Sequence, residues 1–372
     1  MSRCAKFKAI QWATGAMGRS CLRAIIDRDD TELVGLYCHG ERKIGRDAGD
    51  LVHRPVTGIT ATHNRDEILA LDADVVIHCS RIQKDPLVHD DDITALLRSG
   101  KNVISINGNT FPQIWPEQRR IAYETACAAG ESSFLGAGLN PGFVAEKLLA
   151  TLSGICTRVS HVNLHETVIA GMIKSPEYIF DVLGFGSDLD KINLQDGSFA
   201  ASTTLNNMFE EVVSGIAAQH GWNLTEIRRL HRVLPAGRDV EIAAGVVKAG
   251  QVSQIDWQWR GMAGDEERIA LTVSWAIDEE HAGTNPDLWT VKIQGEPNVD
   301  VSLNIERPED MPGSTSGEQM AVSGAVANAI PYAIEAAPGL LNASFATPWY
   351  ADPLQPDYLT SLSRTFAWPA GQ

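Results

Sequence analysis

A turn near the N-terminus has the residue types that bind a phosphate group. An apolar stretch at 7–12 runs into a glycine turn at 14–18, and a helical pattern with apolar residues at 22, 25 and 26 follows at once. A strand, a glycine turn and a helix in this order present backbone N–H groups and a helix N-terminus to a pyrophosphate. Ala13 stands in the place of the first glycine of the G-x-G-x-x-G pattern. We expect a dinucleotide cofactor to bind here, through Thr14, Gly15, Ala16, Met17 and Gly18.

The loop after the second expected strand, 32–38, selects between the two nicotinamide cofactors. An acidic residue at the strand end would bind the ribose 2′-hydroxyl of NAD(H) and repel the 2′-phosphate of NADP(H). Here no acid ends the strand, and the basic residues His39, Arg42 and Lys43 follow. We therefore expect NADP(H) to be preferred, with NAD(H) possible. Glu41 keeps open the alternative of an ordinary solvated loop.

His161, His165 and Glu166 lie close together in the sequence and invite a metal-binding interpretation. The stretch 159–168 alternates like a strand, however, and four residues of a strand span about 13 Å. Two ligands of one zinc ion cannot lie so far apart. We expect no metal site. His165 or Glu166 could instead face a cleft as a proton donor, and an ordinary place in the sheet is the alternative.

Polar residues also follow the apolar stretch 74–79. We expect Ser80 and Arg81, at the end of this strand, to approach the cofactor. His78 is embedded in the apolar run and is better explained as a core histidine.

These residues need a scaffold that brings strand ends together. Up to residue 140, expected strands alternate with expected helices, which predicts a doubly wound, mostly parallel sheet. Ligands of such a sheet lie beyond the carboxyl ends of its strands. The expected strands are 7–12, 32–38, 74–79, 101–106 and 132–136, and the expected helices are 20–27, 66–71, 91–99 and 116–130.

The pattern changes beyond residue 140. We expect a helix at 143–155, a strand at 159–168, a helix at 205–219, and strand-like runs at 240–247, 252–259, 268–277, 288–294 and 299–305. Alternation broken by turns predicts a mostly antiparallel sheet. The fold class is therefore α/β, with a dinucleotide-binding domain at 1–140 and an α+β substrate and dimerisation domain at 141–320. In the segment 321–372 we expect a helix at 323–336, ended or kinked by Pro331, that returns to the parallel sheet, and an irregular tail after Pro338.

Bulk composition narrows the function classes. A chain of 372 residues suggests two domains, and a net charge of −16 disfavours nucleic-acid and anionic-membrane partners. We find no secretory signal or membrane-length apolar run and expect a cytoplasmic protein. The six cysteines are scattered without a C-x-x-C pair, so no disulfide framework is expected.

Apolar residues on the late strands suggest a partner surface. Val246, Ile255, Trp257 and Trp259 would form a partly exposed face of an open sheet. We expect a two-fold homodimer through this face. For Trp257 and Trp259, a packed contact between the sheet and a helix is the alternative, and either is favoured over a substrate platform.

Several segments, taken in order, resemble one family. Residues 136–143 read Gly-Ala-Gly-Leu-Asn-Pro-Gly-Phe, residues 175–186 contain Ser-Pro-Glu and Gly-Phe-Gly, and residues 328–331 read Asn-Ala-Ile-Pro. With the N-terminal turn, these segments are similar to the dihydrodipicolinate-reductase-like proteins that include 2,4-diaminopentanoate dehydrogenase and the native amine dehydrogenases. The resemblance implies a Rossmann domain, an α+β domain, and NAD(P)-dependent interconversion of an amine with a ketone or aldehyde. It also implies cofactor contacts at Asn140, Pro141, Gly142 and Asn328.

One departure from that family concerns the chemistry. Members that reductively aminate carry an acidic pair after the strand equivalent to 103–106, where this chain has Asn107 and Asn109. An amide can orient a substrate but has no proton that titrates near neutral pH. We expect hydride transfer to a carbonyl or imine carbon of a small molecule. A ketone or enone reductase without amination activity and a non-catalytic nucleotide-binding sensor are the alternatives.

Overall fold

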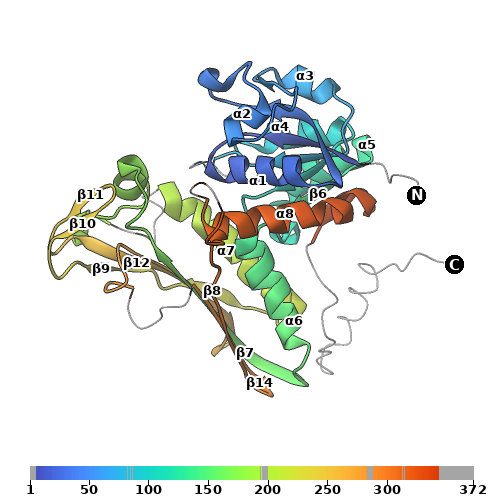
Figure 1. The fold of residues 1–372 in the computed structure, drawn as a ribbon. Helices are drawn as coiled ribbons and strands as arrows, with labels where there is room; N and C mark the ends of the chain where they lie inside the picture. Colours follow the sequence, from blue (N-terminus) through green and yellow to red (C-terminus); the bar gives the residue numbers. More distant parts are fainter. Residues whose placement is uncertain are drawn as a thin grey trace.

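The computed structural model describes residues 6–342, except 82, 84, 86, 193, 195–199, 283–287, 312 and 314 and the side chains of 200–204. Figure 1 shows an N-terminal sheet flanked by helices, a second sheet beyond it, and the helices α7 and α8 in the region where the two halves meet. This arrangement confirms the predicted fold class.

The N-terminal sheet is parallel throughout and has the strand order β16-β6-β5-β4-β1-β2-β3. All four residues of β4 are buried, as expected for a strand with helices on both faces. The strands are β1 Phe7–Trp12, β2 Thr31–Tyr37, β3 Ala61–Thr62, β4 Val75–His78, β5 Asn102–Ser105, β6 Ser133–Gly136 and β16 Gly339–Leu341.

Helices connect these strands close to the predicted positions. They are α1 Ala16–Asp27, α2 Ala48–Val52, α3 Arg65–Ala70, α4 Asp90–Arg98 and α5 Glu117–Gly130, with single turns η1 Glu41–Lys43 and η2 Pro112–Ile114. The sequence analysis missed α2 and β3, which have five and two residues and are too short to show a period. The Asp47 carboxylate caps α2 by accepting a hydrogen bond from the Gly49 amide at 2.7 Å.

The helix α8 (Gly317–Glu335) returns from the second half of the chain to the first sheet, as predicted. It runs beside α1 (Figure 1) and buries Val326, Ala329 and Ile330 against residues of β1, β4, β5 and β6. Pro331 lies inside the helix and does not end it. The tail after Pro338 is not irregular throughout, because Gly339–Leu341 forms β16 and pairs with β6. Residues 343–372 lie outside the described part.

The second sheet is mixed and mostly antiparallel. Its order is β15-β14-β7-β13-β12-β8, with β9 also paired to β12, and β7 and β13 run parallel. The strands are β7 Arg158–Ile169, β8 Glu226–Arg229, β9 Arg232–Pro235, β12 Val252–Ala263, β13 Glu266–Ala276, β14 Trp289–Glu296 and β15 Val299–Leu303. The run 240–247 instead forms a separate hairpin of β10 Val240–Ile242 and β11 Gly245–Val247. The charged edge strands β8 and β9 lack apolar alternation and were missed.

Helices cover one face of this sheet. They are η3 Leu139–Leu148, which continues as α6 Leu149–Ser153, and α7 Ala200–Gln219, with shorter turns η4 Glu177–Val182 and η5 Leu189–Lys191. None of the helices in the described ranges is long and apolar enough to cross a membrane.

The expected apolar outer face is wrong for three of its four residues. Ile255, Trp257 and Trp259 are at most 1% exposed, and only Val246 is substantially exposed. The Trp259 ring packs 4.6 Å from the Phe209 ring of α7, and its indole donates to Asn206 at 3.1 Å. The alternation therefore identified a buried face covered by helices and not a partner surface.

Candidate functional site

The glycine turn at the start of α1 is built from backbone. Gly15 is the N-cap, and the first turn of the helix carries no acidic residue. A Cβ on Gly18 would lie 2.3 Å from the Ala13 carbonyl oxygen, whereas a Cβ on Gly15 would meet nothing within 4 Å. The backbone is thus closely packed around Gly18, whereas the space beside Gly15 is free of protein atoms. Unpaired N–H groups at an uncapped helix N-terminus fit the diphosphate of a dinucleotide.

Positive charge lies directly beside this turn. The Lys43 ammonium group donates to the carbonyl oxygen of Thr14 at 2.7 Å and to its hydroxyl at 2.9 Å. Arg42, on the same short turn, is exposed. The loop after β2 therefore carries two cations next to the site where the resemblance predicts the cofactor's phosphates.

Side chains at the ends of β2 and β4 meet across β1. The Ser80 hydroxyl lies 3.4 Å from Nε2 of His39 and 3.2 Å from Nε2 of His78. Burial lowers the pKa of His78 to about 3, so this imidazole is neutral at physiological pH. Arg81 reaches across to the second domain, where its guanidinium lies 3.6 Å from the Glu177 carboxylate.

Glu166 reaches the first residues of η3. The Asn140 amide donates to its carboxylate at 2.9 Å, which places Glu166 beside the segment Asn140–Gly142. Burial, with a further contribution from the charge of Glu318, raises the pKa of Glu166 to about 8. His165 is the next residue on the strand and points to the opposite face, where it lies 3.1 Å from the Ser274 hydroxyl. Only Glu166 of the two approaches the cofactor candidates.

Asn328 is placed far from the other cofactor candidates. Its side chain accepts a hydrogen bond from Arg28 at 2.9 Å, at the C-terminal end of α1. The glycine turn lies at the opposite end of this helix, about 18 Å away along its axis. Asn328 is exposed on α8, while its motif neighbours Ala329 and Ile330 are buried against the sheet, so the structure does not bring the Asn328 side chain to the glycine turn.

Two asparagines follow β5, at the carboxyl edge of the sheet. Asn107 donates to the Ser80 carbonyl oxygen at 2.9 Å. Asn109 has a φ of 62°, which asparagine tolerates better than most residues, and its side-chain oxygen accepts from Arg119 at 3.3 Å. Both amides are thereby fixed at the ends of β4 and β5.

Asn107 and Asn109 line a cavity that also has a wall from the second domain. Three residues of α7, Asn207, Met208 and Glu211, complete it opposite the asparagines. The packing is close, since a Cβ on Gly108 would lie 2.7 Å from the Met208 side chain. The remaining lining comes from the loop after β4 and from α4 and α5, including His78, His89, Asp90 and Arg119.

Sequence reasoning missed Glu211 and Arg119. Glu211 is one hundred positions from Phe111, whose amide donates to its carboxylate at 2.7 Å. Nothing in the local pattern of α7 distinguishes it from its neighbour Glu210.

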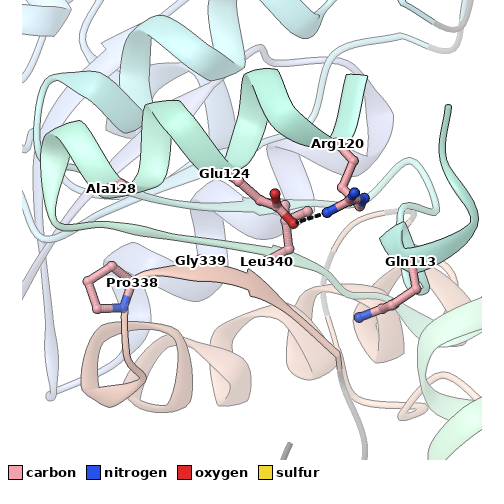
Figure 2. Close-up of a pocket in the computed structure, with 7 residues that line it drawn as sticks. All are labelled: Gln113, Arg120, Glu124, Ala128, Pro338, Gly339 and Leu340. Atoms are coloured by element: carbon pink, nitrogen blue, oxygen red, sulfur yellow. Dashed lines mark hydrogen bonds and ion pairs between the residues drawn. The ribbon is translucent and has the colours of Figure 1, made fainter. Parts of the chain in front are cut away.

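A second hollow lies at the edge of the N-terminal sheet, between α5, η2 and β16. Figure 2 shows its lining, in which the charged side chains Arg120 and Glu124 point toward each other. They form an ion pair of 2.7 Å, and the rest of the lining is Gln113, Ala128, Pro338, Gly339 and Leu340. Because its charges pair with each other, this hollow has little to offer a ligand.

The parallel sheet, its glycine turn and the cavity at its strand ends form the arrangement in which dinucleotide-binding folds hold a ligand. Residues 9–105 match the model of the dihydrodipicolinate reductase N-terminus, which covers the cofactor-binding turn. Residues 143–347, more than half of the chain, match the model of the 2,4-diaminopentanoate dehydrogenase C-terminal domain. The chain therefore belongs to the 2,4-diaminopentanoate dehydrogenase family.

Individual relatives agree with this assignment. The chain is 24% identical to an amine dehydrogenase from Streptomyces virginiae, over 90% of this chain and 94% of the relative. It is 26% identical to 2,4-diaminopentanoate dehydrogenase from Acetoanaerobium sticklandii, over 90% of this chain and 92% of the relative. These relatives and the family models confirm the predicted family and show that the chain is an NAD(P)-dependent oxidoreductase.

Solved structures share the fold. The amine dehydrogenase of Mycobacterium smegmatis has a TM-score of 0.72 at 16% identity, over 92% of this chain and 96% of that chain. A probable dehydrogenase from Thermotoga maritima has a TM-score of 0.55 at 12% identity, over 91% of both chains.

Proposed function

We propose that this enzyme interconverts a small-molecule amine with the corresponding ketone or aldehyde, through an imine, and that it prefers NADP(H). The relatives' names supply the reaction class. The observation that carries the proposal is the cavity at the carboxyl ends of β4 and β5, which holds both amide groups and a buried carboxylate. A carboxylate can hold an ammonium group or accept its proton, and neither alternative function needs one there.

The cofactor would lie along the carboxyl edge of the parallel sheet. The proposal assigns its diphosphate to Thr14–Gly18, its 2′-phosphate to His39, Arg42 and Lys43, and its nicotinamide end to Asn140–Gly142. Ser80 and Arg81 would lie beside its middle. When bound, the nicotinamide supplies or accepts a hydride.

The remaining candidates would handle the substrate. Asn107 and Asn109 would orient the carbonyl or imine by hydrogen bonds. Glu166 is protonated over most of its population at pH 7 and would donate a proton near Asn140. His165 has no place in this proposal, because it lies on the other face of the sheet.

The domain assignment of 1–140, 141–320 and 321–372 remains part of the proposal, with α8 as the returning element. A homodimer also remains proposed, without the apolar face first expected to form it. Light scattering at micromolar concentration tests it, and a monomeric mass would contradict it.

The proposed function is tested by following NADPH and NADH oxidation over a panel of ketones and aldehydes, with and without ammonium chloride. We expect oxidation that requires ammonium and yields an amine, and NADP⁺ reduction with amines in the reverse direction. Carbonyl reduction that ammonium does not affect would favour a ketone reductase. Cofactor binding without turnover across the panel would favour a sensor.

A further inference from the structure

Two buried carboxylates from the second domain meet the loop that follows β5. Glu211 of α7 and Glu146 of η3 are 6% and 4% exposed. The Phe111 amide donates to Oε1 of Glu211 at 2.7 Å. Oε1 of Glu146 is buried without a hydrogen-bond partner in the described part of the chain. Glu211 lines the cavity, and Glu146 lies close enough behind it for the two charges to interact. Two buried acids in this arrangement require a chemical reason.

The other charged residues of the cavity have hydrogen-bond partners, and Asp85 accepts one hydrogen bond from the Leu87 amide at 2.9 Å. Asp90 accepts two hydrogen bonds from Arg119, at 2.8 and 2.9 Å, and one from the Tyr123 hydroxyl at 2.7 Å. His89 lies 2.9 Å from the Arg81 carbonyl oxygen. Glu211 has no lysine or arginine at ion-pair distance among the described residues. It is therefore a buried carboxylate that faces the cavity without a cation bound to it.

The surroundings of Glu211 suit a small cation with several N–H donors. Asn107 directs its amide nitrogen to Ser80, which leaves its carbonyl oxygen as an acceptor. Burial raises the pKa of Glu146 to about 8, and the nearby charge of Glu211 adds to the rise. Glu146 therefore remains mostly protonated at neutral pH. Burial also raises the pKa of Glu211 to about 7, so the negative charge of the pair lies mainly on Glu211 and increases when a cation binds there.

We infer that Glu211 binds the nitrogen of the substrate: an ammonium ion in the amination direction and the ammonium group of the amine in reverse. This inference rests on the proposed function and adds the residue that holds the nitrogen. Its carboxylate supplies from α7 the negative charge that Asn107 and Asn109 cannot supply from the loop after β5.

The proton balance of this assignment closes. Glu211 takes a proton from ammonium, and the ammonia formed attacks the carbonyl carbon to make a C–N bond. The proton then returns to the hydroxyl of the carbinolamine, whose C–O bond breaks to release water and leave a protonated imine. A hydride from the reduced cofactor completes the amine. The sum is ketone, ammonium and NAD(P)H giving amine, water and NAD(P)⁺.

The test compares Glu211→Gln with Glu210→Gln, a matched change at the next position, where the carboxylate pairs with Arg229. Each protein, with NADPH bound, is titrated with ammonium chloride against sodium chloride of equal ionic strength, and the thermal shift is recorded. We expect Glu211→Gln to weaken the ammonium-specific effect by about 10- to 100-fold, as for the loss of a charged hydrogen bond. The Glu210→Gln variant should show the same ammonium-specific effect as the wild type. The affinity for NADPH should be unchanged in both variants.

A conservative variant guards against a folding defect. Glu211→Asp keeps the charge on a shorter side chain and should retain part of the ammonium effect. Wild-type protein without an ammonium-specific shift, or Glu211→Gln with an unchanged one, would overturn the inference.

Turnover separates this inference from the proposed function. If the wild-type enzyme binds ammonium through Glu211 but aminates no carbonyl, the proposed function is refuted and the assignment of Glu211 stands. If the Glu211→Gln variant aminates carbonyls as well as the wild type does, the proposed function stands and the assignment of Glu211 is refuted.

Discussion

Two regions at the carboxyl edge of the parallel sheet are made in different ways. The turn at 13–18 uses backbone N–H groups and the absence of a Cβ at Gly18. The cavity wall, where α7 meets the loop after β5, uses side-chain charges: the partly buried pair of Arg119 and Asp90, and the buried Glu211 beside Glu146. Steric changes should therefore damage the turn, whereas changes of charge or pH should damage the wall.

The wall depends most on one ion pair. The Arg119 guanidinium lies 3.8 Å over the Trp115 ring, and its Nε and Nη2 donate hydrogen bonds to the Asp90 carboxylate. Arg119→Ala leaves the partly buried Asp90 without its cation and removes the stacking on Trp115, and we expect a loss of about 2–4 kcal/mol in the free energy of unfolding by urea. Arg120→Ala on the same helix removes a surface pair with Glu124 and should cost below about 0.5 kcal/mol. Similar losses of stability in the two variants would show that the Arg119–Asp90 pair contributes no more than a surface ion pair.

The buried acids of the wall should make stability depend on pH. Burial raises the pKa of Glu146 to about 8. The folded state therefore holds a proton that the unfolded chain releases above its own pKa of about 4.3, and stability falls as pH rises from about 5 to 8. Glu146→Gln removes the part of this dependence that comes from Glu146; Glu166 and Glu211, whose pKa values are also raised, keep theirs. We expect the variant to gain about 2–4 kcal/mol over wild type at pH 8 and little at pH 5, measured by urea unfolding at both values. An equal gain at the two pH values would contradict the ionisation argument.

This contrast explains what the sequence alone could predict. The turn, the strands of the parallel sheet and the return of α8 follow from local residue patterns, because each strand or helix shows its own period. The wall does not, since Arg119, Glu146 and Glu211 come from three separated helices and meet only in the folded chain. The same limit misplaced two candidates. Asn328 belongs to a recognisable motif, but it lies on α8 beside the end of α1 that is far from the glycine turn. Trp257 and Trp259 alternate with polar residues, and this alternation does not tell a buried face of the sheet from an exposed one.

Substitutions at two glycines of the turn distinguish the packing of its backbone from its contact with the cofactor. Gly18→Ala places a Cβ 2.3 Å from the Ala13 carbonyl oxygen and should cost about 1–3 kcal/mol of stability. Gly15→Ala adds its Cβ in open space, so we expect little change in stability. If the diphosphate lies over Gly15, the affinity for NADPH should nevertheless fall. Thermal unfolding and NADPH titration of both variants give the comparison. A Gly15→Ala variant with normal NADPH affinity would move the diphosphate away from this turn.

The loop after β2 adds side-chain charge to the backbone-built side and gives the smallest expected effect. With a net charge of −16, the field of the protein opposes the extra dianionic group of NADP(H), so local cations must offset it. Lys43 is held on Thr14, and Arg42 is exposed beside it. We expect Arg42→Ala to weaken NADPH binding by about tenfold, ~1.4 kcal/mol, because an exposed charge is partly screened.

NADH is the internal control, since it lacks only the 2′-phosphate and should bind as before. Fluorescence titration of both cofactors gives the ratio. Equal losses for both, or tighter binding of NADH to the wild type, would show that this loop does not recognise the phosphate.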